Sequence, residues 1–223
     1  MKRSLKEWAL RVVILLLGLT IAHLGVTLFL VSNLGSDPFN VMVQGIFRTC
    51  SARLGWSVLT HGRVHIVISL LIILILLFVD RSYIKIGTVL CMICGGPIID
   101  FFTALLDPLL GQGASMVLRI VMLVAGCVIL AYGMTIVIRS DAGTGPNDLV
   151  ALVISEKSGR KFSIVRVLVD ASFILIGFLL GGVVGAGTLV CMLLVGPVAG
   201  FFLPVNGRLI ELLLRRLHAA PEL

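Results

Sequence analysis

A sixteen-residue stretch occurs twice in this chain, and it limits the possible folds more than any other feature of the sequence. Residues 87–102 read GTVLCMICGGPIIDFF and residues 187–202 read GTLVCMLLVGPVAGFF, with eight of the sixteen positions identical. Upstream, glycine and proline positions recur 108 residues later: Gly18, Gly25, Gly35 and Pro38 correspond to Gly126, Gly133, Gly143 and Pro146. The chain therefore consists of two copies of one unit. The first copy carries about eight extra residues in or near 48–61.

The composition places both copies in a membrane. Of the 223 residues, 59% are hydrophobic and only 13% are charged, whereas a soluble domain is about half apolar and about a quarter charged. The five cysteines lie mostly inside apolar runs, which argues against a disulfide framework. The sequence therefore predicts an all-α integral membrane protein whose main partner is the lipid bilayer.

Six apolar runs are predicted to cross the bilayer, at residues 12–31, 64–79, 86–106, 116–138, 164–180 and 183–205. Two shorter helices are predicted at 38–54 and 146–158, because Pro38 and Pro146 follow capping residues and proline suits the first helical position. These short helices either lie in the membrane interface or enter the membrane part way and return. The predicted regions are an N-terminus (1–11), a first three-helix repeat (12–106), a loop (107–115), a second repeat (116–205) and an amphipathic surface tail (206–223).

The distribution of basic residues predicts the orientation. With the N-terminus in the cytoplasm, fourteen of the lysines and arginines fall on the cytoplasmic side and four on the other. Both termini are therefore expected on the cytoplasmic side of the membrane. The net charge of +7 is explained by this asymmetry, so we expect no nucleic-acid partner.

An odd number of spans in each copy has a geometric consequence. Three spans deliver the chain to the opposite side, so the second copy must be inserted upside down relative to the first. Inverted repeats with interrupted segments at matching positions are typical of secondary transporters, which bind substrates near the midplane where half-helix termini meet. The interruptions here predict a central substrate site lined by polar residues of both copies: Ser36, Asp37, Asn40, Gln44, Thr144, Asn147 and Asp148. If both short helices lie flat instead, these residues merely cap them at opposite faces, about 30 Å apart.

The chain resembles the YczE/YyaS/YitT group of bacterial membrane proteins. The resemblance rests on the glycine-to-proline segment after the first span of each copy, the Gly-Thr…Gly-Pro segment of the third span, and residues 180–188, which read LGGVVGAGT. It covers about residues 18–202 and implies a polytopic fold in the cytoplasmic membrane, with relatives suggested to export small molecules. In the first copy, Asn40 stands where relatives typically have an aspartate, so a carboxylate expected there is an amide, although Asp37 lies close by.

Polar residues inside the apolar runs supply further candidates. Asp170 lies seven residues into its span, and Arg166 precedes it by one helical turn. The pair is either a proton or ion coupling site or a buried ion pair that fixes helix contacts. His23 reads as a hydrogen-bonded core histidine or a proton relay, and His61 and His65 as interface residues.

Several kinds of chemistry have no pattern in this sequence. The CxxC at Cys91 and Cys94 is not kept in the second copy, and we expect no metal site and no cofactor. No catalytic group is recognisable, so an enzyme is not expected. The sequence predicts a small secondary transporter or exporter of an unknown small molecule. The alternative is a membrane-embedded substrate-binding or accessory subunit, and small-residue faces at Gly177 and Gly196 are predicted to support a homodimer or a partner subunit.

Overall fold

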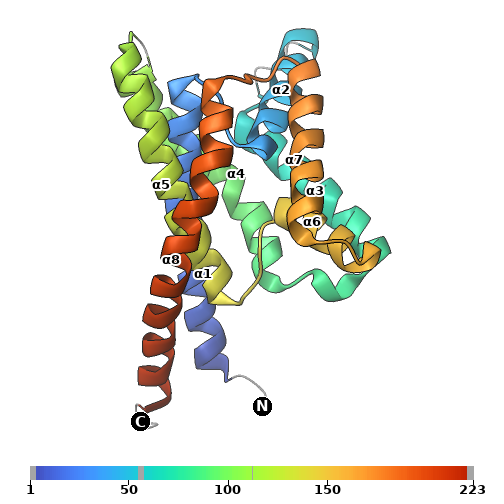
Figure 1. Cartoon of the computed structure of the whole chain (residues 1–223), viewed down its shortest axis with the longest axis vertical. Helices are drawn as coiled ribbons and strands as arrows, with labels where there is room; N and C mark the ends of the chain where they lie inside the picture. Colours follow the sequence, from blue (N-terminus) through green and yellow to red (C-terminus); the bar gives the residue numbers. More distant parts are fainter. Residues whose placement is uncertain (1–3, 55–57, 112, 220–223) are drawn as a thin grey trace.

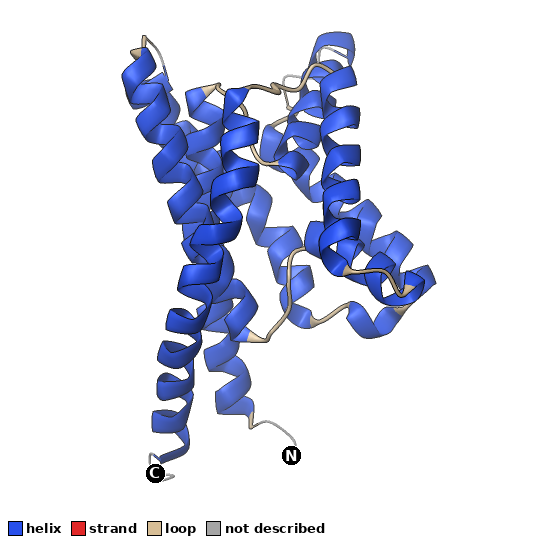
Figure 2. Ribbon diagram, viewed as in Figure 1, coloured by secondary structure: helices blue, strands red, loops and turns tan. Residues whose placement is uncertain are grey.

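The computed structural model of the protein describes residues 4–54, 58–111 and 113–219. Parts of the predicted N-terminus, loop and tail, and of the extra segment in the first copy, lie outside these ranges. Among the described residues the secondary structure is helical (Figure 2). The helices are α1 (Leu5–Ser32), α2 (Pro38–Leu54), α3 (His61–Val79), η1 (Arg81–Tyr83), α4 (Ile86–Leu106), η2 (Asp107–Gly111), α5 (Met116–Ser140), α6 (Pro146–Ser158), α7 (Phe162–Leu179) and α8 (Ala186–Ala219).

Five helices are long and apolar enough to cross a membrane: α1, α3, α4 with its extension η2, α5 and α8. Large apolar side chains on their outer faces are exposed, including Phe78 of α3, Val117 of α5 and Leu193 of α8. Contiguous exposed apolar surface of this kind is typical of helices that face lipid. The fold is therefore an all-α membrane fold, and a sixth span through α7 stays a prediction.

Helices α1 and α5 pack against each other through glycines. An added Cβ on Gly25 would lie 2.7 Å from the carbonyl oxygen of Gly126, and one on Gly133 would lie 2.6 Å from that of Gly18. Residue numbers increase along one helix as they decrease along the other, so the helices are antiparallel. Absence of side chains at these positions lets the two backbones approach closely.

Helix α8 packs along α5, and it is longer than predicted. The span at 183–205 and the tail from 206 form one continuous helix, Ala186–Ala219, with Pro197 and Pro204 inside it. Asn206, where the tail was expected to separate, is buried and donates from Nδ2 to Thr135 Oγ1 of α5 at 2.7 Å. This buried hydrogen bond attaches α8 to α5 at the point where the sequence suggested a surface helix.

The remaining helices form a second group (Figure 1). Helices α2 and α7 pack through Gly45 and Gly177, where an added Cβ would lie 2.3 to 2.5 Å from backbone oxygens of the other helix. The face of α7 that was predicted to meet a partner is thus occupied at Gly177 by the chain's own α2. Gly196 of α8 has open space beside it, so a partner at that position stays a prediction. Helix α4 contacts both α1 and α3 and joins the two groups.

Most helix boundaries agree with the sequence signals. Helix α2 begins at Pro38, α6 begins at Pro146, and α4 covers 86–106, as predicted. The loop expected from residue 107 begins instead with a π-helical turn, Asp107–Gly111. Helix α4 itself ends at Leu106, with Asp107 as its C-cap and Pro108 in the turn that follows.

Candidate functional site

The two linkers that precede α2 and α6 follow the same backbone path. Asn33 and Asp141 occupy matching positions in the two copies, and both have φ of 53°. Gly35 and Gly143 follow at matching positions with φ of 123° and 152°. A residue in the left-handed conformation follows each long helix, as is common at helix C-termini. Two residues later, a glycine with positive φ reverses the direction of the chain before the next helix. The duplicated sequence therefore builds the same turn twice.

Each linker binds the other copy. The carbonyl oxygen of Leu34 accepts a hydrogen bond from the backbone N–H of Gly187, at the start of α8, at 3.0 Å. The carbonyl oxygen of Ala142 accepts one from the N–H of Gly87, at the start of α4, also at 3.0 Å. The first linker thus contacts the third long helix of the second copy, and the second linker contacts that of the first.

The linker glycines are required by these contacts as well as by their dihedral angles. An added Cβ on Gly35 would lie 2.6 Å from Thr188 Oγ1, and one on Gly143 would lie 2.5 Å from the backbone nitrogen of Thr88. Both distances are shorter than van der Waals contact. Any larger residue would therefore push the linker away from the helix to which it is bonded.

Asp37 is the centre of a polar cluster at the start of α2. Its carboxylate accepts hydrogen bonds from the Asn40 backbone N–H at 3.3 Å, from Asn40 Nδ2 at 2.8 Å and from Ser36 Oγ at 3.3 Å. Asn40 Oδ1 lies 3.1 Å from His61 Nε2. Because an amide oxygen only accepts, His61 donates this bond. The cluster joins the predicted site residues Ser36, Asp37 and Asn40 to a histidine of α3.

Arg166 is the centre of a second cluster. It pairs through Nε with Asp170 Oδ2 at 2.9 Å, as the i, i+4 spacing predicts, and through Nη1 with Asp148 Oδ1 of α6 at 2.6 Å. Asn147 Nδ2 donates to the same Asp148 oxygen at 3.2 Å. One guanidinium therefore holds two carboxylates from two helices, and it joins residues that the sequence placed in separate roles.

The two clusters are electrostatically connected through Asp170. Both Asp37 and Asp148 are close enough to Asp170 for their charges to interact with it. The Oδ1 atom of Asp170 is buried and has no hydrogen-bond partner among the described residues. Arg166 is shared by two carboxylates, and Asp170 Oδ1 is left as an open acceptor. Such a group can bind a cation, a proton or an amino group.

Two other predicted site residues have different surroundings. Gln44 is buried, and its Oε1 accepts the backbone N–H of Val183 at 2.8 Å. It therefore ties α2 to the turn between α7 and α8. Thr144 is half-buried in the second linker. Their predicted contact with a substrate stays a prediction.

Two histidines that the sequence analysis treated separately lie together in the structure. The rings of His23 and His65 are 5.7 Å apart and perpendicular, and His65 also contacts the ring of Phe39. His23 donates from Nδ1 to the carbonyl oxygen of Leu19 at 2.9 Å, which agrees with a hydrogen-bonded core histidine. His65 is buried rather than interfacial, and its Nδ1 has no partner within the described part of the chain. No spacing in the sequence signals the contact of His23 with His65, because the two residues lie on different helices.

No group of three or more metal-binding side chains occurs among the residues that the structure describes. Cys91 is buried and Cys94 is half-buried, and both are free.

The outer end of α6 is fixed to the turn between α3 and α4. Lys157 pairs with Asp80 at 3.4 Å, and the Tyr83 hydroxyl donates to Glu156. The N–H and hydroxyl of Ser82 both donate to Asp80. These hydrogen bonds, with a smaller contribution from Lys157, lower the pKa of Asp80.

Comparison with known proteins places the chain among uncharacterised membrane proteins. It is 29% identical over 216 residues to the uncharacterized membrane protein YczE of Bacillus subtilis, covering 96% of this chain and 95% of YczE. It is 30% identical over 199 residues to an uncharacterized protein of Haemophilus influenzae, covering 88% and 84% of the two chains. The uncharacterized protein YyaS of B. subtilis is 26% identical over 193 residues, or 86% and 92%.

No solved structure matches this chain significantly. A family model does match, over residues 9–204, which include every residue of the two polar clusters. Its description is a family of unknown function, DUF6198. The resemblance to YczE and YyaS that the sequence motifs indicated is confirmed. This chain belongs to the DUF6198 family of membrane proteins.

Proposed function

We propose that this protein is a small secondary transporter that exports a small molecule, built as two three-helix repeats of inverted orientation. The observation that carries the proposal is the reciprocal docking of the linkers, Leu34 on Gly187 and Ala142 on Gly87. Two copies of one unit exchange identical contacts only when a two-fold axis relates them. The antiparallel packing of α1 and α5 through corresponding glycines fits the same axis.

The course of the chain supports this arrangement. In Figure 1 the linker after α1 leaves the upper end of the molecule and turns inward before α2, and the linker after α5 does so from the lower end before α6. Helix α7 then runs from beside α6 to the upper end of the molecule (Figure 1), and we assign it as the sixth crossing. Helices α2 and α6 therefore begin inside the molecule, which brings the partial positive ends of their dipoles to membrane depth.

The polar clusters supply the groups that transport requires. Asp37 and Asn40 come from the first copy and Asp148, Arg166 and Asp170 from the second, and the charges of Asp37 and Asp148 both reach Asp170. We assign the substrate site to the region between the two clusters. Asp170, whose Oδ1 has no protein partner in the described structure, is the residue at which a proton or cation couples to transport.

A substrate-independent experiment tests this function. The wild-type protein and the Asp170→Asn variant are each produced in a bacterial host, and untargeted mass spectrometry compares the small molecules in the cells and the medium. We expect at least one compound to accumulate in the medium with the wild type and not with the variant. That compound, radiolabelled, should then cross proteoliposomes with purified wild-type protein only when a proton gradient is imposed.

Glu211→Gln is the matched control, because it neutralises an exposed carboxylate of the Glu211–Arg215 pair on α8, outside the two clusters. It should export like the wild type. If medium and cell profiles are the same for wild type and Asp170→Asn, Asp170 is not the coupling residue. If the compound binds but its flux equals that of protein-free liposomes, the chain is not a transporter. Binding without flux would support the accessory-subunit alternative.

A further inference from the structure

A cavity lies between the ends of α1, α5 and α8, away from the two polar clusters. Its volume is about 440 Å³, which is within the usual size of small-molecule sites. It lies at the end of the molecule where α1 begins and α8 ends (Figure 1). Three arginines from three helices line it with one glutamate and apolar residues: Arg11, Arg139, Arg208, Glu211, Pro204, Gly207, Ile210 and Leu214.

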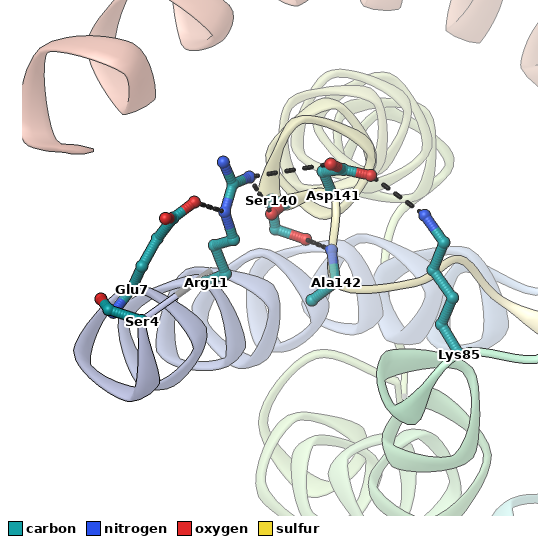
Figure 3. Close-up of polar contacts among 7 residues, drawn as sticks. All are labelled: Ser4, Glu7, Arg11, Lys85, Ser140, Asp141 and Ala142. Atoms are coloured by element: carbon teal, nitrogen blue, oxygen red, sulfur yellow. Dashed lines mark hydrogen bonds and ion pairs between the residues drawn. The ribbon is translucent and has the colours of Figure 1, made fainter. Parts of the chain in front are cut away.

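Arg11 is held in place by contacts on two sides (Figure 3). Its Nε pairs with Glu7 at 2.8 Å, and its Nη1 donates to the carbonyl oxygen of Ser140 at 2.9 Å. Asp141 Oδ2 lies 4.0 Å from the same Nη1 and also pairs with Lys85. These contacts fix the guanidinium at the junction of α1 and α5, so it does not have to be ordered when a ligand binds.

Arg139 is also positioned by the fold. Its Nε donates to the carbonyl oxygen of Leu203 at 3.1 Å, and its two Nη groups take no part in that bond. An added Cβ on Gly207 would lie only 3.0 Å from Nε. Because Gly207 has no side chain, the Arg139 side chain can pack directly against the backbone of α8 at this position.

The charges in the cavity are unbalanced. Among the described residues, Glu211 is the one acidic side chain that lines it, and its carboxylate pairs with Arg215 at 2.6 Å. Arg11 is paired with Glu7, whereas Arg139 and Arg208 add two further positive charges. Planar guanidinium groups match the geometry of phosphate oxygens and form charge-assisted hydrogen bonds with them. The cavity is therefore suited to a phosphate group.

The surroundings indicate a lipid source for that phosphate. Leu209 and Leu212 lie next to Arg208 and Glu211 in sequence and are more than half exposed, as is Val13 of α1. Basic pockets between membrane helices on the cytoplasmic side bind anionic headgroups, and the basic-residue asymmetry predicts that this end is cytoplasmic. We propose that this cavity binds the phosphate of an anionic phospholipid headgroup, with the acyl chains against the exposed leucines.

Native mass spectrometry of the full-length protein, titrated with phosphatidylglycerol or phosphatidylcholine, tests the proposal. The wild type should retain phosphatidylglycerol preferentially. The Arg139→Gln, Arg208→Gln double variant should lose about 30-fold in affinity, since each basic residue near a membrane contributes roughly a factor of five. Arg216→Gln, on the same helix but outside the cavity, should bind like the wild type.

Gly207→Ala provides a second test without any change in charge. Its Cβ would lie 3.0 Å from Arg139 Nε, so the guanidinium must shift slightly, and phosphatidylglycerol affinity should fall although the net charge is unchanged. The proposal is overturned if the double variant and Arg216→Gln bind phosphatidylglycerol with equal affinity. It is also overturned if the wild type retains phosphatidylcholine as well as phosphatidylglycerol. Inorganic phosphate at millimolar concentration should not displace the lipid. If it displaces the lipid and alone raises the melting temperature of the wild type but not of the double variant, the cavity is a site for free phosphate.

Discussion

The bridge at Arg166 allows a quantitative prediction about charge balance. Its guanidinium lies 2.6 Å from Asp148 and 2.9 Å from Asp170, with about 32%, 30% and 15% of the three side chains exposed. Removing one partner from a fully buried pair costs about 3 to 5 kcal/mol, and from an exposed pair about 0 to 1 kcal/mol. For this partly buried site we expect Arg166→Gln to lower the free energy of unfolding by about 2 to 3 kcal/mol.

Most of that cost arises because two carboxylates remain without their cation. Neutralising them as well, in Arg166→Gln with Asp148→Asn and Asp170→Asn, should restore stability to within about 1 kcal/mol of the wild type. Thermal unfolding in detergent measures the difference. The single variant should melt roughly 4 to 12 °C lower, at about 2 to 4 °C per kcal/mol for a chain of this size.

The chain contains a matched control for this experiment. Arg215 pairs with Glu211 at the same 2.6 Å, but the two side chains are 74% and 61% exposed. Exposed i, i+4 pairs on helices contribute only about 0.3 to 0.5 kcal/mol, so Arg215→Gln should change the melting temperature by no more than about 2 °C. If the triple variant is as unstable as Arg166→Gln, unbalanced charge does not explain the loss and the reasoning is refuted. The same holds if Arg166→Gln melts with the wild type.

Three further predictions concern the linkers, the surface turn and the orientation. Gly143→Ala should lower the free energy of unfolding by about 2 kcal/mol or more, because the residue has φ of 152° and its added Cβ would clash with Thr88. Gly159→Ala is the control: this residue has φ of 66° with open space beside it, so the change should cost only about 1 kcal/mol in thermal unfolding. Because the pKa of Asp80 is lowered in the folded protein, its charged form contributes stability above the unfolded pKa of about 3.9, and this stability is lost as the pH falls. Asp80→Asn should therefore flatten the decline in melting temperature between about pH 5 and pH 3. Parallel curves of melting temperature against pH for the variant and the wild type would contradict this. With Cys50 as the single cysteine, a membrane-impermeant maleimide should label intact cells; labelling only after the cytoplasmic side is opened would reverse the predicted orientation.

Local signals predicted the helix boundaries well. Proline is favoured at the first position of a helix, where its missing N–H costs nothing, and α2 and α6 begin at Pro38 and Pro146. The continuation of α8 was not predictable in this way. The tail reads as amphipathic by itself, and the bond of Asn206 to Thr135 depends on a helix that lies 71 residues earlier in the chain.

The same distinction applies to the polar clusters. The pair of Arg166 and Asp170 follows from helical periodicity, because residues four apart lie on one face. The bond of Arg166 to Asp148 crosses from α7 to α6, and its existence depends on the angle between those helices. The contact between His23 and His65 likewise depends on how α1 and α3 pack. Sequence reasoning named most of these residues, but their partners are set by tertiary packing.

Reciprocal linker docking also determines when the protein can be completed during synthesis. Leu34 is made roughly 150 residues before Gly187, its hydrogen-bond partner, so at about 5 to 20 residues per second its carbonyl waits on the order of 10 to 30 s. Ala142 meets Gly87, which already exists when Ala142 is made. The hydrogen bond that holds the first linker therefore forms only after the last helix has been made. A chain interrupted before α8 would leave the first half of the protein without its closing contact and expose it to membrane quality-control proteases.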